Sequence, residues 1–118
     1  MNASHIHIGI GDLDSALSWL DQVVGLAPLR IIPHKALFAF GNVMLVLDSE
    51  LAEAPATIAF ATGDCDGEFL RLTARGAVPM SEPRDYPWGV RSAYLKGPGQ
   101  LTLEIEQTLG APEARIRT

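Results

Sequence analysis

The sequence predicts an α+β fold made of two copies of one βαβββ module, and three observations lead to this prediction. Residues 5–23 align with residues 57–75 at an offset of 52, with five identical positions. Residues 41–48 align with residues 99–106 at an offset of 58. Within each copy, an alternating apolar segment precedes a helical apolar stripe and three more strand-like segments. A period that occurs twice indicates a duplicated module, because a solenoid needs at least three copies.

The first module begins with a strand whose alternation, HIHIGI, places its isoleucines on one face and His5 and His7 on the other. Asp12 is predicted to cap the helix that follows, and Gly25 is predicted to end it. Three further strands are expected at about residues 27–32, 35–41 and 43–48.

The second module repeats this order. The segment TIAFAT predicts a strand with Ile58 and Phe60 on one face. Asp64 is predicted to cap the helix after it, and Gly76 is predicted to end that helix. The remaining strands are expected at about residues 77–81, 89–96 and 100–106.

The length of 118 residues predicts a single domain, 1–118. Its modules, 4–48 and 56–107, are joined by a linker, 49–55, and followed by a polar tail, 108–118, that is expected to fray. The formal net charge of −5, without a cluster of Lys and Arg, argues against nucleic acid as a partner. Cys65 is the one cysteine, which excludes an intramolecular disulfide. The chain has no signal-peptide pattern and no apolar run of membrane-spanning length, so we expect a cytoplasmic protein without a membrane partner.

The two-residue period also predicts a second, less apolar face on the sheet of each module. In the first module this face carries His5, His7, Gly9, Met44 and Val46. In the second module it carries Thr57, Ala59, Ala61, Thr102, Glu104 and Glu106. Such small and polar residues indicate a face that curves around a ligand, and a solvated sheet face is the alternative.

The repeated strand, Gly-Asp-Leu-Asp and helix unit, the segments VVGLAPL and YPWGVRSAYLKGPGQLTLEIE, and the duplication resemble the vicinal oxygen chelate superfamily. This superfamily includes glyoxalase I, extradiol dioxygenases, fosfomycin resistance enzymes and bleomycin resistance proteins. The resemblance covers about residues 4–106. It implies that the two modules pair into a U-shaped mixed sheet around a cavity, and that the protein is a homodimer.

Metal-using members of this family place their ligands on the first and fourth strands of each module. By resemblance, these positions fall on His5, Val46, Thr57 and Glu104. Valine cannot bind a metal and a threonine hydroxyl binds one poorly, so His5 and Glu104 are the ligands retained. His7 shares a face with His5 and is the candidate third ligand of a two-histidine, one-carboxylate set. Without a metal, His5 and Glu104 are expected to form a hydrogen-bonded pair.

Two further candidates lie in the second module. Trp88 begins a strand and is placed to stack on a flat ligand, and Arg91 would bind an anionic group if it faces inward. The predicted ligand pocket therefore consists of His5, His7, Val46, Thr57, Ala59, Trp88, Arg91 and Glu104.

The predicted function is the binding of a small, partly aromatic molecule in the sheet cavity, in the manner of bleomycin resistance proteins, with no cofactor. The alternative is a metal-dependent lyase, isomerase or dioxygenase of the same superfamily, with a divalent metal ion as its cofactor.

Overall fold

The computed structural model describes residues 1–110 and divides into two compact units. The first unit is Met1–Ala56 together with Pro98–Leu101, and the second is Thr57–Gly97 together with the chain from Thr102 onward. The boundary at Ala56 lies just after the predicted linker. Neither α-helix of the described chain is long and apolar enough to cross a membrane.

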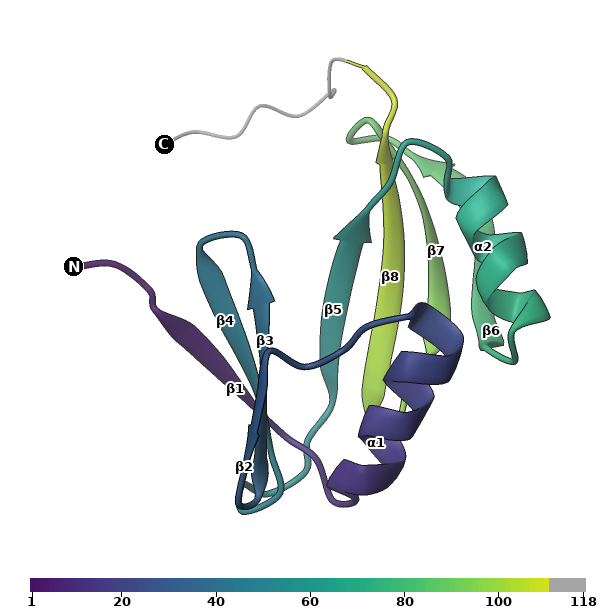
Figure 1. The fold of residues 1–118 in the computed structure, drawn as a ribbon. Coiled ribbons are helices and arrows are strands. Elements are labelled where there is room, and N and C mark those ends of the chain that lie inside the picture. Colours follow the sequence, from purple (N-terminus) through teal and green to yellow (C-terminus); the bar gives the residue numbers. More distant parts are fainter. Residues whose placement is uncertain (111–118) are drawn as a thin grey trace. The chain divides into compact units, whose positions relative to one another are not determined.

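Each unit contains one α-helix and four strands in the predicted order (Figure 1). The elements of the first unit are β1 (His5–Gly9), α1 (Leu13–Trp19), the π-helix η1 (Leu20–Val24), β2 (Arg30–Ile32), β3 (Lys35–Phe40) and β4 (Val43–Asp48). Those of the second are β5 (Ala56–Ala61), α2 (Cys65–Ala74), β6 (Val78–Tyr86), β7 (Val90–Lys96) and β8 (Leu101–Thr108).

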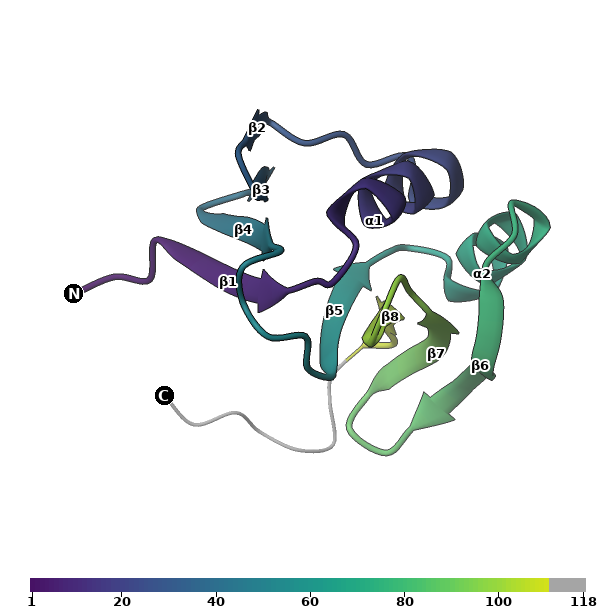
Figure 2. The same cartoon turned by 90° about the horizontal axis from the view of Figure 1, so that it is seen from below.

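The two sheets have equivalent strand orders, β1-β4-β3-β2 and β5-β8-β7-β6. In the first sheet β1 runs parallel to β4, whereas β2, β3 and β4 are mutually antiparallel neighbours. In the second sheet β6, β7 and β8 are likewise antiparallel neighbours. Figure 2 shows each helix on one side of its own sheet, α1 beside the first and α2 beside the second. The α+β fold of two βαβββ modules is therefore confirmed.

Both predicted helix caps are present. The Asp12 carboxylate accepts a hydrogen bond from the backbone N–H of Ser15 at 3.0 Å, and the Asp64 carboxylate accepts one from Gly67 at 3.0 Å. Gly25 ends the first helical segment with φ +80°, a left-handed conformation that favours glycine. The sequence did not predict that this segment changes from α-helix to π-helix at Leu20.

Burial follows the predicted faces, with one exception in β1. Exposure falls along this strand from 54% at Ile6 to 1% at Ile10, just beyond the strand end. Ile6 therefore stays exposed although it shares a face with Ile8 and Ile10, because it lies at the far end of β1 from α1. The buried side chains of the two units include Ala16, Leu20, Phe38, Leu45, Leu47, Leu72, Leu95, Leu103 and Ile105.

Several strand ends differ from prediction. β2 is three residues long and begins at Arg30, whereas β6 continues to Tyr86 with two register irregularities. β8 continues to Thr108, so the predicted polar tail begins too early, and its residues 111–118 lie outside the described residues. Irregular pairing explains the long β6, because bulges let a strand continue through residues that break the alternation.

Candidate functional site

A cavity of about 230 Å³ lies on the face of the first sheet opposite α1. The register of the sheet builds it, because His5 pairs with Met44 and His7 pairs with Val46 across the β1–β4 ladder. Paired residues point to the same face of a sheet. The lining residues are His5, His7, Ile32, Lys35, Leu37, Met44 and Val46.

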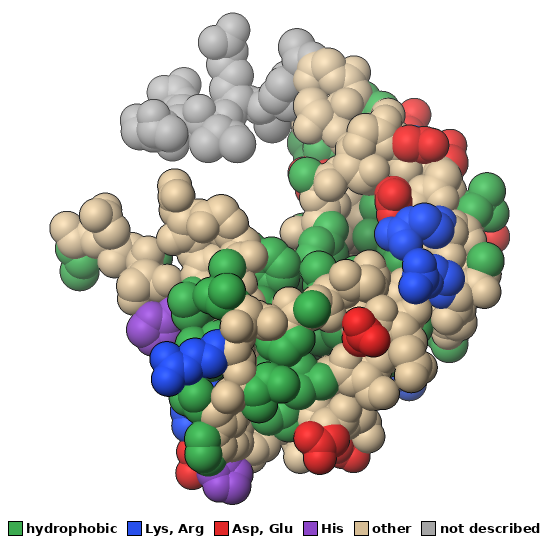
Figure 3. Space-filling view, viewed as in Figure 1, with side chains coloured by type: hydrophobic (Ala, Val, Ile, Leu, Met, Phe, Trp, Pro, Cys, Tyr) green, Lys and Arg blue, Asp and Glu red, His purple; other side chains and the backbone are tan. Residues whose placement is uncertain are grey.

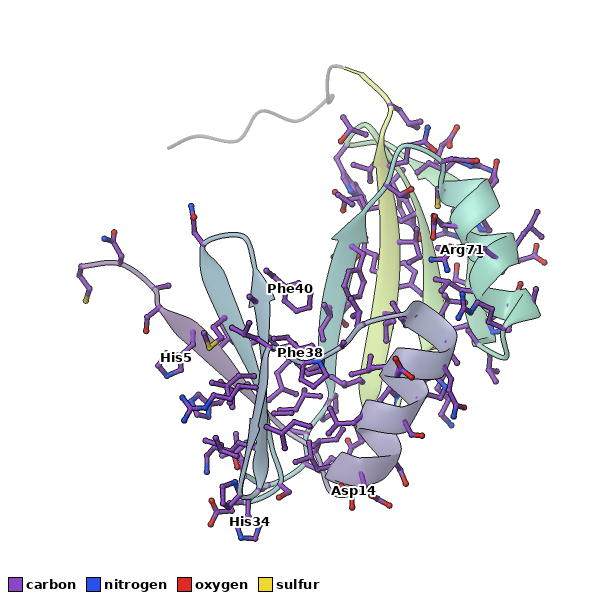
Figure 4. The ribbon with its side chains drawn as sticks, in the orientation of Figure 1. His5, Asp14, His34, Phe38, Phe40 and Arg71 are labelled. Carbon is purple, nitrogen blue, oxygen red and sulfur yellow. The ribbon has the colours of Figure 1, made fainter. Side chains whose placement is uncertain are left out.

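The two imidazoles of β1 lie side by side at this cavity. Their ring centroids are 5.0 Å apart and the rings are tilted by 53°. His5 lies on the opposite side of the sheet from Phe38 and Phe40, whose side chains point toward the α1 side (Figure 4). Figure 3 shows His and Lys or Arg side chains next to hydrophobic ones in this part of the first unit. The side chains of β1 therefore alternate between the two faces of the sheet as predicted.

Each imidazole has a different hydrogen-bond partner. Nδ1 of His5 lies 2.8 Å from the hydroxyl of Ser4, the residue before it. Nδ1 of His7 lies 3.2 Å from Oδ2 of Asp48, at the end of β4. Ser4 is exposed, whereas Asp48 is 7% exposed, so the partner of His7 is the more firmly held.

Asp48 is the centre of a small charged network. Its carboxylate also accepts a hydrogen bond from the backbone N–H of Glu50 at 2.9 Å and lies 3.7 Å from Nζ of Lys35. Burial acts to raise the pKa of Asp48, but the bonds from Glu50 and His7 and the charge of Lys35 together hold it below its usual value. Asp48 is therefore an ionised acceptor beside His7.

Lys35 is the cation of this cavity, and it is already paired. Its ammonium donates to Glu50 at 2.7 Å, and this bond is the main reason that its pKa is raised. Neither Lys35 nor Asp48 was predicted as a site residue. Asp48 could have been found from its spacing, because it falls two residues after Val46 on the same face of β4.

Gly9 does not leave room for a ligand, contrary to the sequence-based expectation. A Cβ atom at this position would collide with the backbone carbonyl oxygen of Ala52 and would lie 2.8 Å from that of Leu51. Both residues belong to the linker, 49–55. Gly9 is therefore small because the linker backbone packs against it.

The donor set in the first unit fits a catalytic metal poorly. Val46 occupies one of the ligand positions that the resemblance implies, it is 4% exposed, and its side chain carries no donor atom. Among the described residues, no three His, Cys, Asp or Glu side chains are grouped closely enough to hold a metal ion. His5, His7 and Val46 share one cavity, and their contact with a ligand stays a prediction.

The Glu104 carboxylate lies in the second unit, within a polar cluster on β7 and β8. It accepts a hydrogen bond from the Ser92 hydroxyl at 3.0 Å and pairs across the ladder with Tyr94. Burial, then the charge of Glu104, raises the pKa of Tyr94. The same two causes raise the pKa of Glu106. This face of the second sheet therefore disfavours further negative charge.

Three other predicted pocket residues are exposed in the second unit. Thr57 and Ala59 lie on β5, where exposed and partly buried residues alternate. Trp88 lies between β6 and β7, is 50% exposed and contacts Tyr86 with ring centroids 4.8 Å apart. Their contact with a ligand stays a prediction.

Arg91 lies on the α2 side of the second sheet, opposite to Glu104; the sequence left its face open, and its contact with a ligand stays a prediction. Its guanidinium donates to Asp66 of α2 at 3.0 Å and to Asp85 of β6 at 2.8 Å. It lines a separate cavity of about 310 Å³ with Asp66, Phe69, Leu70, Glu82 and Pro83. The sequence did not define the turn at residues 86–89, so it did not indicate which residues of the following strand share a face.

Solved structures share this fold. A glyoxalase/bleomycin resistance protein/dioxygenase from Nocardioides has a TM-score of 0.82 at 24% identity, over 99% of this chain and 90% of that chain. An antibiotic-binding protein, TnmS3, from Streptomyces sp. CB03234 has a TM-score of 0.75 at 20% identity, over 92% and 96%. A lactoylglutathione lyase from Agrobacterium tumefaciens has a TM-score of 0.73 at 19% identity, over 90% and 92%. Identities this low show a common fold.

A search of curated proteins found no match to this sequence. The sequence profile of one family does match, over residues 2–105. That range contains the first module, the second module up to residue 105, and all eight predicted pocket residues. The chain therefore belongs to the Glyoxalase/Bleomycin resistance protein/Dioxygenase superfamily.

Proposed function

We propose that the protein binds a small, partly aromatic molecule, and that the cavity on the first sheet holds its aromatic part. The observation that carries this proposal is the composition of the cavity wall, in which two imidazoles stand beside the apolar side chains of Ile32, Leu37, Met44 and Val46. Sites for drug-sized ligands measure roughly 300–1,000 Å³. A cavity of about 230 Å³ is therefore suited to one or two fused rings of a larger ligand.

The second module is proposed to contribute the rest of the binding surface through Thr57, Ala59, Trp88 and Glu104. This part of the proposal rests on the family resemblance, in which both modules supply the walls of one cavity. The proposal includes a cytoplasmic homodimer. Exposed apolar side chains such as Leu29, at 66%, and Ile31, at 62%, support a surface that another copy covers.

Binding without metal catalysis is favoured over the lyase, isomerase or dioxygenase alternative. The fold is shared with both an antibiotic-binding protein and a lyase, so the fold alone does not choose between them. Val46 favours binding without a metal, because its buried side chain, which has no donor atom, occupies a position where the metal-using members place a ligand. A His and a Glu alone would leave most of a coordination sphere to water.

Metal analysis combined with a binding screen tests this proposal. Purified protein is dialysed exhaustively, its metal content is measured, and a set of fused-ring aromatics is screened by thermal shift and then by NMR. We expect little metal, and NMR shifts at His5 and His7 on binding. Near-stoichiometric metal that is lost in His5→Ala, His7→Ala and Glu104→Gln would instead establish the metal-dependent enzyme.

A further inference from the structure

We infer that Asp48 sets the hydrogen-bonding polarity of the first-sheet cavity: it holds His7 with its proton on Nδ1, so that Nε2 accepts a hydrogen bond from an aromatic hydroxyl of the ligand. Asp48 is thus a positioning residue and His7 a specificity-determining one. The inference rests on the proposed function and adds the chemical class of the ligand's polar group.

The position of the proton follows from the partner of Nδ1. The distance of 3.2 Å between His7 Nδ1 and Asp48 Oδ2 is within hydrogen-bonding range. An ionised carboxylate can only accept, so Nδ1 must carry the proton in this contact. Because neutral imidazole has one N–H, Nε2 is then left with its lone pair.

That lone pair is available to a ligand. His7 lines the cavity, and within residues 1–110 no protein group makes a hydrogen bond to its Nε2. The position of the proton on His5 is not fixed in this way, because its Nδ1 partner is the Ser4 hydroxyl, which can either donate or accept a hydrogen bond. The fixed acceptor of the cavity is therefore His7.

An anionic group does not suit Nε2, because an ionised carboxylate or phosphate oxygen has no proton to donate to its lone pair, whereas a neutral hydroxyl has one. Two cations lie on this face of the sheet. Lys35 is paired with Glu50 at 2.7 Å and lies 3.7 Å from Asp48, and Arg30 pairs with Leu37 in the β2–β3 ladder.

An Asp48→Asn substitution is expected to reverse this polarity. In the native protein, Oδ1 of Asp48 accepts from the backbone N–H of Glu50 at 2.9 Å while Oδ2 faces His7. An asparagine would keep its oxygen at Glu50 and place its NH₂ group toward His7. The amide would then donate to Nδ1, and Nε2 of His7 would carry the proton.

The first measurement is spectroscopic and needs no ligand. In slightly alkaline buffer, the ¹⁵N shifts of His7 are expected to show protonated Nδ1 in the wild type and protonated Nε2 in Asp48→Asn. Glu50→Gln is the matched control, because it weakens the pairing of Lys35 and leaves the Asp48–His7 contact in place. Protonated Nε2 in the wild type would overturn the inference.

The second measurement compares two probes of similar shape, naphthol and methoxynaphthalene. Naphthol donates a hydrogen bond and methoxynaphthalene only accepts one. We expect the wild type to prefer naphthol by about ten-fold, the scale of one hydrogen bond. Asp48→Asn should remove or reverse this preference, and Glu50→Gln should retain it.

The outcomes separate this inference from the proposed function. If both probes bind the wild type with equal affinity, the cavity binds aromatics but Asp48 does not set its polarity, and the inference fails alone. If neither probe binds although His7 carries its proton on Nδ1, the proposed binding function fails, and the ligand class inferred here fails with it.

Discussion

The backbone carbonyl oxygen of Ala52 lies so close to Gly9 that no Cβ atom fits between them. Gly9 belongs to β1, and Ala52 belongs to the linker that follows β4. The internal repeat places Ala61 at the position equivalent to Gly9, so the second module accepts a side chain there. The need for glycine is therefore specific to the first module, where the linker crosses the end of β1.

Gly9→Ala is expected to lower the free energy of unfolding by about 2 kcal/mol or more, because backbone atoms cannot yield as a side chain does. Chemical denaturation measures the change. Gly63→Ala is the control, since a Cβ atom at Gly63 meets nothing within 4 Å. A Gly9→Ala protein as stable as the wild type would show that the linker does not rest on β1.

Leu37→Trp is expected to weaken naphthol binding by at least about ten-fold, because the indole would fill a cavity of about 230 Å³. Isothermal titration calorimetry measures the affinity. Val78→Trp is the control, since Val78 is 58% exposed and is not among the residues that line the cavity. Equal losses in both variants would place the binding site elsewhere.

Ala59→Phe is expected to abolish ligand binding at little cost in stability, as the proposed contribution of the second module requires. Ala59 is exposed, and surface substitutions usually change the free energy of unfolding by within about 0.5 kcal/mol. Thermal unfolding and titration of the ligand measure the two effects. A loss of about 2 kcal/mol, typical of an overpacked core, would show instead that this side chain packs against protein.

Local patterns were sufficient to predict the module order and the caps. Asp12 and Asp64 act within three residues of their own position, and the alternation in β1 fixes the face of His5 and His7 without reference to the rest of the chain. Such features depend on residues that are close in the sequence, and the module order and the caps occur in both modules.

Contacts between distant segments were not predictable in the same way. Asp48 reaches His7 across 41 residues, and the Ala52 carbonyl reaches Gly9 from a linker with no periodic pattern. The face of Arg91 depends on the register after an irregular turn, and a shift of one residue moves a side chain to the opposite face. Strand pairing decides the Asp48–His7 contact and the face of Arg91, and the path of the linker decides the contact with Gly9; a local sequence pattern indicates neither.

Arg91→Met is expected to leave the affinity for naphthol unchanged, because the guanidinium is held on the α2 side of the second sheet by Asp66 and Asp85. The same titration that measures Leu37→Trp measures this variant. If Arg91→Met reduces the affinity but leaves the free energy of unfolding unchanged, Arg91 contacts the ligand after all.

The cap of α1 predicts a specific dependence of stability on pH. The Asp12 carboxylate accepts hydrogen bonds from the Ser15 N–H at 3.0 Å and the Ser15 hydroxyl at 2.8 Å. These bonds, the backbone one first, lower the pKa of Asp12 below its ordinary value of 3.8. A carboxylate with a lowered folded-state pKa adds stability above the unfolded pKa, and that stability is lost as pH falls through the folded pKa.

Asp12→Asn should therefore make unfolding less dependent on pH in this acidic range, because an asparagine oxygen can still cap the helix but does not titrate. Urea denaturation of both proteins at a series of acidic pH values gives the difference in unfolding free energy. We expect this difference to be largest above pH 3.8 and to shrink as the pH falls. Asp14→Asn is the control, since within residues 1–110 the Asp14 carboxylate makes no hydrogen bond. A difference that stays constant with pH in Asp12→Asn would mean that the Ser15 contacts do not favour the ionised carboxylate.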